Sequence, residues 1–433
     1  MDIAPIILAY LLPVGVVLIA WGSWDSDRAR DHATTVLWVM SLAAIVYAAF
    51  GFAFQFGGIG LRADVPPGLS GLDRMWSPLS GPDSRYWTLI GLKGFALNAP
   101  SILPGDTTLL FTQFLHQLPV VIAATLIPAL ALAGRVRSIV ISIITILAAG
   151  LIVPLVGMWA WGGGWLFSLG HDTKFGHGFI DPGSAAAAFT TAGFMTLAAL
   201  MALKIRRSPD QPPELTPIVS PLRSIFGAIL FGLGWLAWLT TDPILQSIRS
   251  IDLAFATTNA LLAAAASTVL ATLYGWFTTG KPNAHLAARG ALSGFIASMA
   301  AAPFVPTLAA LATGAIAGLW TPIGIFMIER WLHLDDTSGS IATSGFAGLW
   351  SIITVGLLAD GMYGAGWNNI GVTDYLGASG QGVTGLFTVA NLQSDPGQIS
   401  AQITGTIAIV VFSLIVTWLV MRPWRRSQQT SKG

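Results

Sequence analysis

Asp181 is the residue whose position most strongly suggests chemistry, because it places an ionisable acid near the start of a long apolar run. A carboxylate inside a bilayer costs roughly 2.5–3.5 kcal/mol or more, so it is expected to face a partner, a cavity or a pore. Asp181 also directly precedes Pro182, a pattern typical of a helix N-terminus. Two compatible roles therefore stay open: a helix cap, and a cation-attracting group on a path.

Asp242 is the second candidate, since it ends an apolar run that contains Trp235 and Trp238. An acid beside an indole face attracts a small cation, and the ring contributes roughly 0.5–2 kcal/mol. Trp161, which opens the sequence WGGG, is a further candidate for the same vestibule. A helix cap or an interfacial acid is the alternative for Asp242, and interfacial tryptophans are common in membrane proteins.

His116 is the third candidate, in an apolar run that also holds Gln113 and Gln117. The pattern predicts either a hydrogen bond between helices or a pore residue. The two histidines of HDTKFGH, residues 171–177, do not have a convincing ligand spacing, so no metal or cofactor is expected. No nucleophile elbow, phosphate loop or dinucleotide fingerprint occurs, and an enzyme is not expected.

The elements that must position these residues are membrane-spanning helices. The 433 residues are 54% hydrophobic and 9% charged, with a mean hydropathy of +0.70, whereas a soluble domain is nearer a quarter charged. Apolar runs of about 20 residues recur from end to end, which predicts an all-α polytopic membrane protein. The net charge of +1 supports no nucleic-acid partner. The absence of cysteine excludes disulfides and thiolate metal sites.

We predict about eleven transmembrane helices in a single domain over residues 1–421, followed by a short basic cytoplasmic tail over 422–433. The predicted spans are 3–22, 35–57, 108–133, 138–160, 179–203, 222–240, 251–277, 286–304, 307–329, 341–360 and 402–421. The first span lacks a basic region before its apolar core, so it is predicted to be a retained helix and not a signal peptide.

The basic residues of the links are distributed unequally between the two sides. One side carries Arg28, Arg30, Arg135, Arg137, Lys204, Arg206, Arg207, Arg223, Lys281, Arg289, Arg330, Arg422, Arg425, Arg426 and Lys432. The other carries only Arg62, Arg74, Arg85, Lys93, Lys174 and Arg249. The positive-inside rule makes the first side cytoplasmic, with the N-terminus outside the cell membrane. Two long loops, 58–107 and 361–401, are then outer caps or subunit contacts, with substrate capture as the alternative.

Short motifs in this order and spacing resemble the ammonium transporter family (Amt/Mep/Rh) over nearly the whole chain. They are WGGG at 161–164, Gly234-Trp235, Ala254-Phe255 with Asn259, Gly280-Lys281-Pro282, GALSGFIA at 290–297, GAIAGL at 314–319, Asp335-Asp336 and SGFAGLW at 344–350. The resemblance implies two inverted five-helix halves plus a final helix, usually in a homotrimer with one pore per subunit that carries ammonium.

The resemblance also implies site residues. The family's outer-site tryptophan falls on Trp161 and its recruiting serine on Asp242. Its two gate phenylalanines fall on His116 and Trp238, and its two pore histidines fall on Asp181 and Ser344 when the sequences are aligned without gaps. A structural acid near the fifth span falls on Asp172, with Thr173 as the alternative. Both pore histidines of the family are therefore replaced in this sequence.

We therefore expect an ammonium channel or transporter with an atypical acid-lined pore in the lipid bilayer. The loss of both histidines leaves open a second hypothesis, a non-conducting ammonium sensor or structural subunit. A channel for another small cation, such as methylammonium, is the third.

Overall fold

The computed structural model describes residues 3–24, 26–62, 65–98, 108–207, 220–248, 250–389 and 391–427. Arg249 and Lys432 lie outside these residues, as do 99–107 of the first long loop and 428–433 of the predicted tail.

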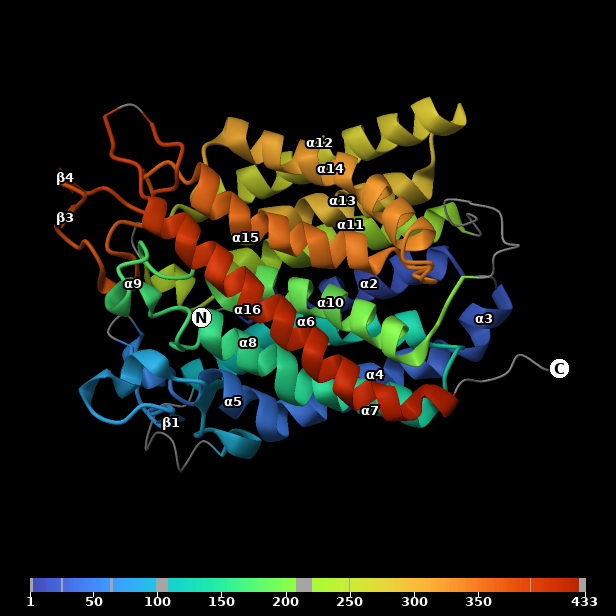
Figure 1. Ribbon diagram of the computed structural model, residues 1–433, viewed down its shortest axis with the longest axis horizontal. Coiled ribbons are helices and arrows are strands. Elements are labelled where there is room, and N and C mark those ends of the chain that lie inside the picture. The colour runs from blue at the N-terminus through green and yellow to red at the C-terminus, as the bar shows by residue number, and fades with distance from the viewer. Residues whose placement is uncertain are drawn as a thin grey trace.

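The described chain is built almost entirely of helices (Figure 1). The first ten are α1 (Ala4–Leu8), α2 (Leu11–Gly22), α3 (Ser26–Asp31), α4 (Ala33–Val46), α5 (Phe52–Phe56), α6 (Thr108–Leu132), α7 (Ser138–Leu147), α8 (Val153–Ala160), α9 (Leu169–Asp172) and α10 (Ala185–Leu203). The others are α11 (Pro221–Thr241), α12 (Leu253–Thr279), α13 (Ala284–Ser298), α14 (Thr307–Arg330), α15 (Ala347–Leu358) and α16 (Pro396–Met421).

Several shorter segments extend or join these helices. The π segments are η1 (Tyr47–Gly51), η7 (Ala148–Ile152) and η10 (Ile341–Phe346), and the 3-10 turn η8 (Pro182–Ser184) leads into α10. Two small antiparallel pairs occur in the long loops: β1 (Met75–Trp76) with β2 (Ile90–Gly91), and β3 (Asp374–Tyr375) with β4 (Ala378–Ser379).

Ten helices within the described ranges are long and apolar enough to cross a membrane, and they overlap ten of the eleven predicted spans. The eighth predicted span corresponds to α13, which has 15 residues and so rises about 22 Å. Its start is set by Asn283, whose side chain accepts a hydrogen bond from the backbone N–H of Leu286. The all-α polytopic fold class is confirmed, with one helix shorter than predicted.

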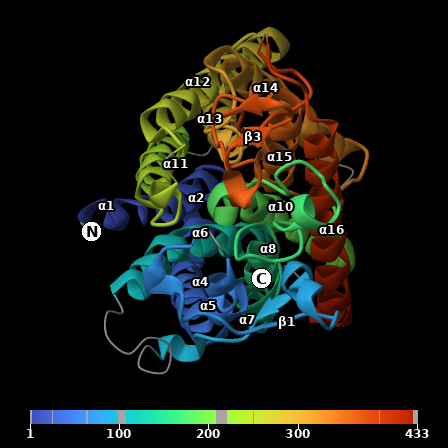
Figure 2. The same cartoon turned by 90° about the vertical axis from the view of Figure 1, so that its left-hand side faces the viewer.

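The helices run side by side along the long axis of Figure 1. The end that carries α9 and β1–β4, on the left of that view, we call the long-loop end. Figure 2 looks at this end and shows α6 and α10 near the centre, with α12 and α16 toward the margin. The burial of these helices agrees with this arrangement. In the most apolar 18-residue stretch of each span, 94% of the residues are buried for α6 and 89% for α10, against 33% for α12 and 28% for α16. The helices α6 and α10 therefore form the interior of the helix bundle.

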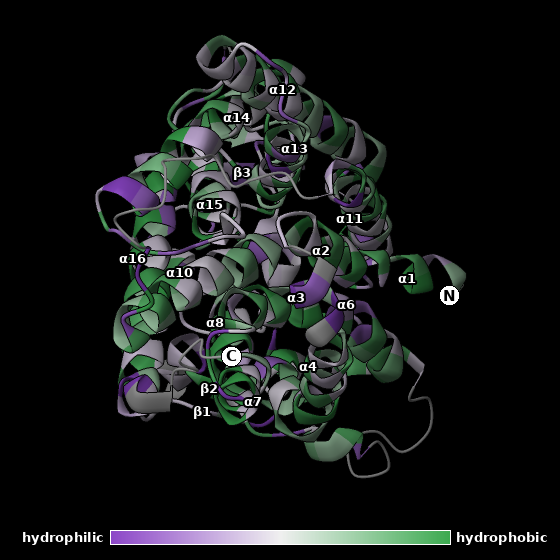
Figure 3. Cartoon of the chain, turned by 90° about the vertical axis from the view of Figure 1, so that its right-hand side faces the viewer, coloured by the Kyte–Doolittle hydropathy of each residue, from purple (hydrophilic) through white to green (hydrophobic). Residues whose placement is uncertain are grey.

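The opposite end carries α3 and most of the basic links. Figure 3 looks at this end and shows a hydrophilic α3 among largely hydrophobic helices. Here Arg135 pairs with Asp335 at 2.7 Å, and Arg207 pairs with Glu329. Asp336 accepts a hydrogen bond of 2.9 Å from the backbone N–H of Ile341 at the start of η10. Of the two acids before the tenth predicted span, Asp336 thus holds the helix start, as acids near a helix N-terminus do, and Asp335 pairs with Arg135.

Candidate functional site

His116 and Trp238 come together although α6 and α11 are far apart in the sequence. Their rings stack at a centroid distance of 4.5 Å. His116 Nε2 lies 2.9 Å from the Trp238 carbonyl, and the Trp238 indole N–H donates to the His116 carbonyl at 2.7 Å. A carbonyl only accepts, so Nε2 of His116 carries a proton. Trp235 continues the stack at 5.1 Å from Trp238. The two residues predicted at the gate positions are therefore locked to each other.

Asp242 lies at the end of this stack and is 1% exposed. Its Oδ1 accepts hydrogen bonds from the backbone N–H groups of Ile244 and Leu245, at 2.8 and 3.0 Å. Its Oδ2 has no hydrogen-bond partner among the described residues. One oxygen therefore shapes the turn after α11, and the other is a buried acceptor that is free for a donor.

Gly183 brings the start of α10 against Asp242 and Trp238. A Cβ at Gly183 would stand 2.1 Å from Trp238 Cη2 and 3.1 Å from Asp242 Oδ2, and the residue has a φ of +65°. A side chain is therefore excluded by both space and backbone conformation. The Gly183 carbonyl also accepts a hydrogen bond of 3.2 Å from Gln117 Nε2. The backbone of η8 thus forms one wall of this site.

Polar atoms without partners gather on the same face of α6. Gln113 is fully buried, and neither its amide nitrogen nor its amide oxygen has a partner among the described residues. The same holds for His116 Nδ1 and Gln117 Oε1. Buried polar atoms nearly always find a partner, so such a group of exceptions indicates water or a polar ligand. We call His116, Gln117, Trp238 and Asp242 the capture site.

Trp161 lies at the long-loop end with partners different from those of the capture site. It is fully buried against Trp367, at 5.7 Å, and Phe167, at 6.3 Å. The Arg62 guanidinium stands over its ring at 4.9 Å from the centroid and donates to its carbonyl. The indole N–H of Trp161 has no partner among the described residues. An arginine therefore already occupies a cation position on this ring.

Asp181 caps α10. Its Oδ1 accepts from the backbone N–H of Ala186 at 3.1 Å, and its Oδ2 accepts from that of Ala187 at 2.7 Å. The side chain is fully buried. A carboxylate at this position satisfies N–H groups that have no partner within the helix, and it complements the helix dipole. The structure therefore shows the capping role that the sequence left open for Asp181.

Ser344 and Asp181 lie at different depths along the helix bundle. It is buried in the π segment η10, and its hydroxyl donates to the Ser340 carbonyl at 2.5 Å. This segment packs backbone to backbone on α10, because a Cβ at Gly193 would lie 2.3 Å from Gly345 Cα. Gly193 stands eight residues after Ala185, about 12 Å along the helix. The structure therefore does not bring Ser344 and Asp181 together as a pair.

Phe189 is the residue that sequence reasoning missed. It is fully buried on α10, between the depths of Asp181 and Gly193, and it packs edge-on against Phe231 of α11 at 5.6 Å. Phe231 in turn contacts Phe295 at 6.4 Å. The gap-free alignment from WGGG hid this position. Counting from the Asp181-Pro182 helix start, which the sequence does display, would have brought it out.

Asp172 and its rival Thr173 are both away from the start of α10. Asp172 is an exposed residue at the end of α9, and Thr173 donates to the Leu169 carbonyl at 2.7 Å. The acid that stands at the start of the fifth span is Asp181. The helix α9 lies between WGGG and α10, and Asp172 is its last residue.

Comparisons with known proteins agree on one family. A model described as Ammonium Transporter Family matches residues 2–423. An ammonium transporter of Bacillus subtilis is 26% identical over 433 residues, covering 96% of this chain and 89% of that protein. Ammonium transporter Amt2 of Archaeoglobus fulgidus is 30% identical over 247 residues, a match that spans 56% of this chain and only 52% of the relative.

Solved structures share the fold. A structure titled Sensor Amt Protein aligns with a TM-score of 0.76 and 22% identity, over 99% of this chain and 93% of that one. Mep2 of Candida albicans aligns with a TM-score of 0.74 and 20% identity, over 99% of this chain and 85% of that one.

Proposed function

The chain belongs to the ammonium transporter family, and on this premise we propose that it captures ammonium at the capture site and moves it across the cell membrane. The relatives matched by sequence are named ammonium transporters. The observation that carries the proposal is the partnerless, buried Oδ2 of Asp242. It supplies a negative charge and a hydrogen-bond acceptor beside a face of stacked rings.

The chemistry of ammonium matches these groups. The ion is small, carries one positive charge and offers four N–H donors. Asp242 Oδ2 and Gln117 Oε1 are buried acceptors that lack a protein donor, and charge-assisted hydrogen bonds are about twice as strong as neutral ones. The Trp238 ring packs between His116 and Trp235 and helps to enclose these acceptors. The positive-inside rule puts this site on the outer side, with the C-terminus cytoplasmic.

Beyond the capture site the proposed path is mainly apolar. Phe189 and Phe231 stand at the middle depth, and the Asp181 carboxylate is committed to the α10 backbone. The free energy needed to transfer an unpaired charge from water into such a section is large, whereas that for neutral ammonia is much smaller. We therefore propose that Asp181 is structural and that the acid which serves the cation is Asp242. The proton that ammonium gives up passes to Asp242 Oδ2, which has no other donor among the described residues, and returns from there to the outer solution. The neutral ammonia then crosses the middle section past Phe189 to Ser344. A homotrimer, usual in this family, completes the proposal.

Transport assays with proteoliposomes test the proposal through Asp242→Asn. The variant keeps an oxygen for the N–H groups of Ile244 and Leu245 and removes the charge. Losing a hydrogen bond to a charged group is worth about 1.5–3 kcal/mol, so the half-saturating ammonium concentration should rise at least tenfold. Asp252→Asn is the matched control, because Asp252 also caps a helix through Oδ1 but is exposed. An equal rise of the half-saturating ammonium concentration in both variants would refute the capture site. A parallel assay with methylammonium decides whether ammonium or methylammonium is the preferred cation.

A non-conducting ammonium sensor is the second candidate, favoured by the packing of the middle section. Phe189 against Phe231 and Gly193 against Gly345 leave side chain on side chain and backbone on backbone along α10. This candidate predicts ammonium binding that depends on Asp242, together with vesicles that show neither current nor internal pH change. Transport by the wild-type protein would exclude it.

A further inference from the structure

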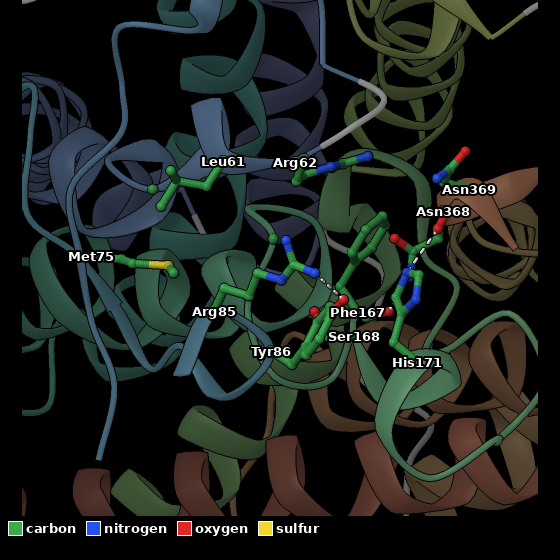
Figure 4. A pocket seen from close by; sticks show the side chains of 12 residues that line it. Leu61, Arg62, Met75, Arg85, Tyr86, Phe167, Ser168, His171, Asn368 and Asn369 are labelled. Atoms are coloured by element: carbon green, nitrogen blue, oxygen red, sulfur yellow. Dashed lines mark hydrogen bonds between the residues drawn. The ribbon is translucent and has the colours of Figure 1, made fainter. Parts of the chain in front are cut away.

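We propose that a pocket at the long-loop end binds a small organic carboxylate. The pocket has a volume of about 190 Å³ and lies among Arg62, Arg85, His171 and the aromatic residues Tyr86 and Phe167. Figure 4 shows Arg62, Arg85 and His171 around the same space, each from a different segment of the chain. The side chains at the capture site are not among its lining residues.

The charge of the lining selects an anion. Two guanidinium groups and an imidazole face the pocket, and no aspartate or glutamate is among the residues that line it. Guanidinium groups match carboxylates in geometry and bind them through paired N–H donors. Ser168 and Asn369 add further polar groups to the same wall.

The cationic side chains are held in place by their neighbours. Arg85 donates to the Tyr86 hydroxyl at 2.6 Å, and the Tyr86 ring stacks on the His171 ring at 5.2 Å. His171 Nε2 lies 2.9 Å from the Asn368 carbonyl, so this nitrogen carries the proton. Arg62 is held by the Trp161 carbonyl and by the Phe167 ring, 4.0 Å from its guanidinium. Side chains ordered before binding lose less entropy when the ligand arrives.

The shape of the pocket favours an organic anion over an inorganic one. Leu61, Met75 and Phe167 add an apolar wall to the lining. A bare phosphate ion would leave this wall without a partner, whereas the carbon chain of a small organic acid would cover it. The volume also exceeds that of a few water molecules, each with a share of about 30 Å³ in the liquid.

Arg62 links this pocket to cation capture, a step that rests on the function proposed above. Its guanidinium stands over the Trp161 ring and repels an approaching cation. A carboxylate bound beside Arg62 would offset that charge. Ammonium capture should therefore strengthen when the anion is present on the same side of the membrane.

Calorimetric titration of the full-length protein in neutral detergent with succinate tests the site without any transport. We expect saturable binding that is at least tenfold weaker in Arg85→Gln. Arg85 is exposed, so the change should leave the fold intact, which the thermal midpoint checks. Arg74→Gln is the matched control, since Arg74 is an exposed arginine of the same loop that does not line the pocket.

Three results would overturn the site. The first two are no saturable succinate binding and equal binding by Arg85→Gln. The third is binding only of inorganic phosphate, which represents a free ion, or only of micelles containing phosphatidylglycerol, which represent a lipid headgroup.

The coupling between the pocket and ammonium capture is tested separately. Succinate added outside should lower the half-saturating ammonium concentration in wild-type vesicles and leave it unchanged in Arg85→Gln. Binding without this shift would overturn the coupling alone, and a protein that fails to transport leaves the binding result intact.

Discussion

The capture site differs from Asp181 and Ser344 in how its buried polar atoms are satisfied. At the capture site, Asp242 Oδ2, His116 Nδ1 and Gln117 Oε1 are buried without a partner among the described residues. By contrast, both oxygens of Asp181 accept backbone N–H groups at the start of α10, and the Ser344 hydroxyl donates within η10. Both regions are equally buried, so burial alone does not separate them.

This difference teaches which acid serves a ligand. A buried carboxylate that caps a helix already has hydrogen-bond donors in the backbone, so its removal destabilises the fold. A buried carboxylate oxygen without a donor is expensive for the protein by itself and becomes favourable when a cation arrives. The first description fits Asp181 and the second fits Asp242.

The largest effect is expected from Asp181→Ala. The change leaves two buried N–H groups of α10 without acceptors, and each such group costs about 1–3 kcal/mol. The free energy of unfolding should fall by about 2–6 kcal/mol, seen as a lower thermal midpoint in detergent. Asp172→Ala, the neighbouring acid on exposed α9, should have little effect. An Asp181→Ala protein with unchanged stability and altered ammonium selectivity would move Asp181 from the fold to the path.

Acid should destabilise the long-loop end through His177. This side chain is fully buried, and burial lowers its pKa to about 4. Unfolded histidine titrates near 6.5, so between these pH values the unfolded chain binds more protons. Stability is complete above about pH 6.5 and decreases as the pH falls toward 4, by about 3 kcal/mol in total.

Thermal midpoints measured from pH 7 to 4.5 check this slope. His177→Phe, which keeps a ring against Tyr375, should flatten it, whereas His171→Phe should not, because His171 is exposed. A slope that persists in His177→Phe would assign the acid sensitivity to another group.

The smallest effect is expected from His116→Phe. The stack on Trp238 is kept, while the hydrogen bond from Nε2 to the Trp238 carbonyl is lost. A bond of this kind contributes about 0.5–1.5 kcal/mol, so the half-saturating ammonium concentration should change by a few fold, less than for Asp242→Asn. Thr112→Val is the control, since the Thr112 hydroxyl bonds only within α6, to Thr108. A complete loss of transport in His116→Phe would make the imidazole an essential group on the path.

Much of the fold was predictable because its signals are local. Apolar runs of about 20 residues predicted eleven spans, and the structure contains ten of them as long helices. The pair Asp181-Pro182 indicated a helix start. The depth of a residue was less accessible. An ungapped count from WGGG crosses α9 and aligns Asp181 with a pore position, whereas the structure shows Asp181 at the start of α10.

The sequence by itself determined the membrane-spanning class, the family and the capping role open to Asp181, since each depends on residues close together in the chain. The tertiary structure alone decided that His116 and Trp238 hold each other across 122 residues of sequence. It also decided that Asp242 keeps one oxygen unpaired and that Arg62 covers Trp161. Those facts depend on how helices and loops pack against one another, and no periodicity along the chain records them.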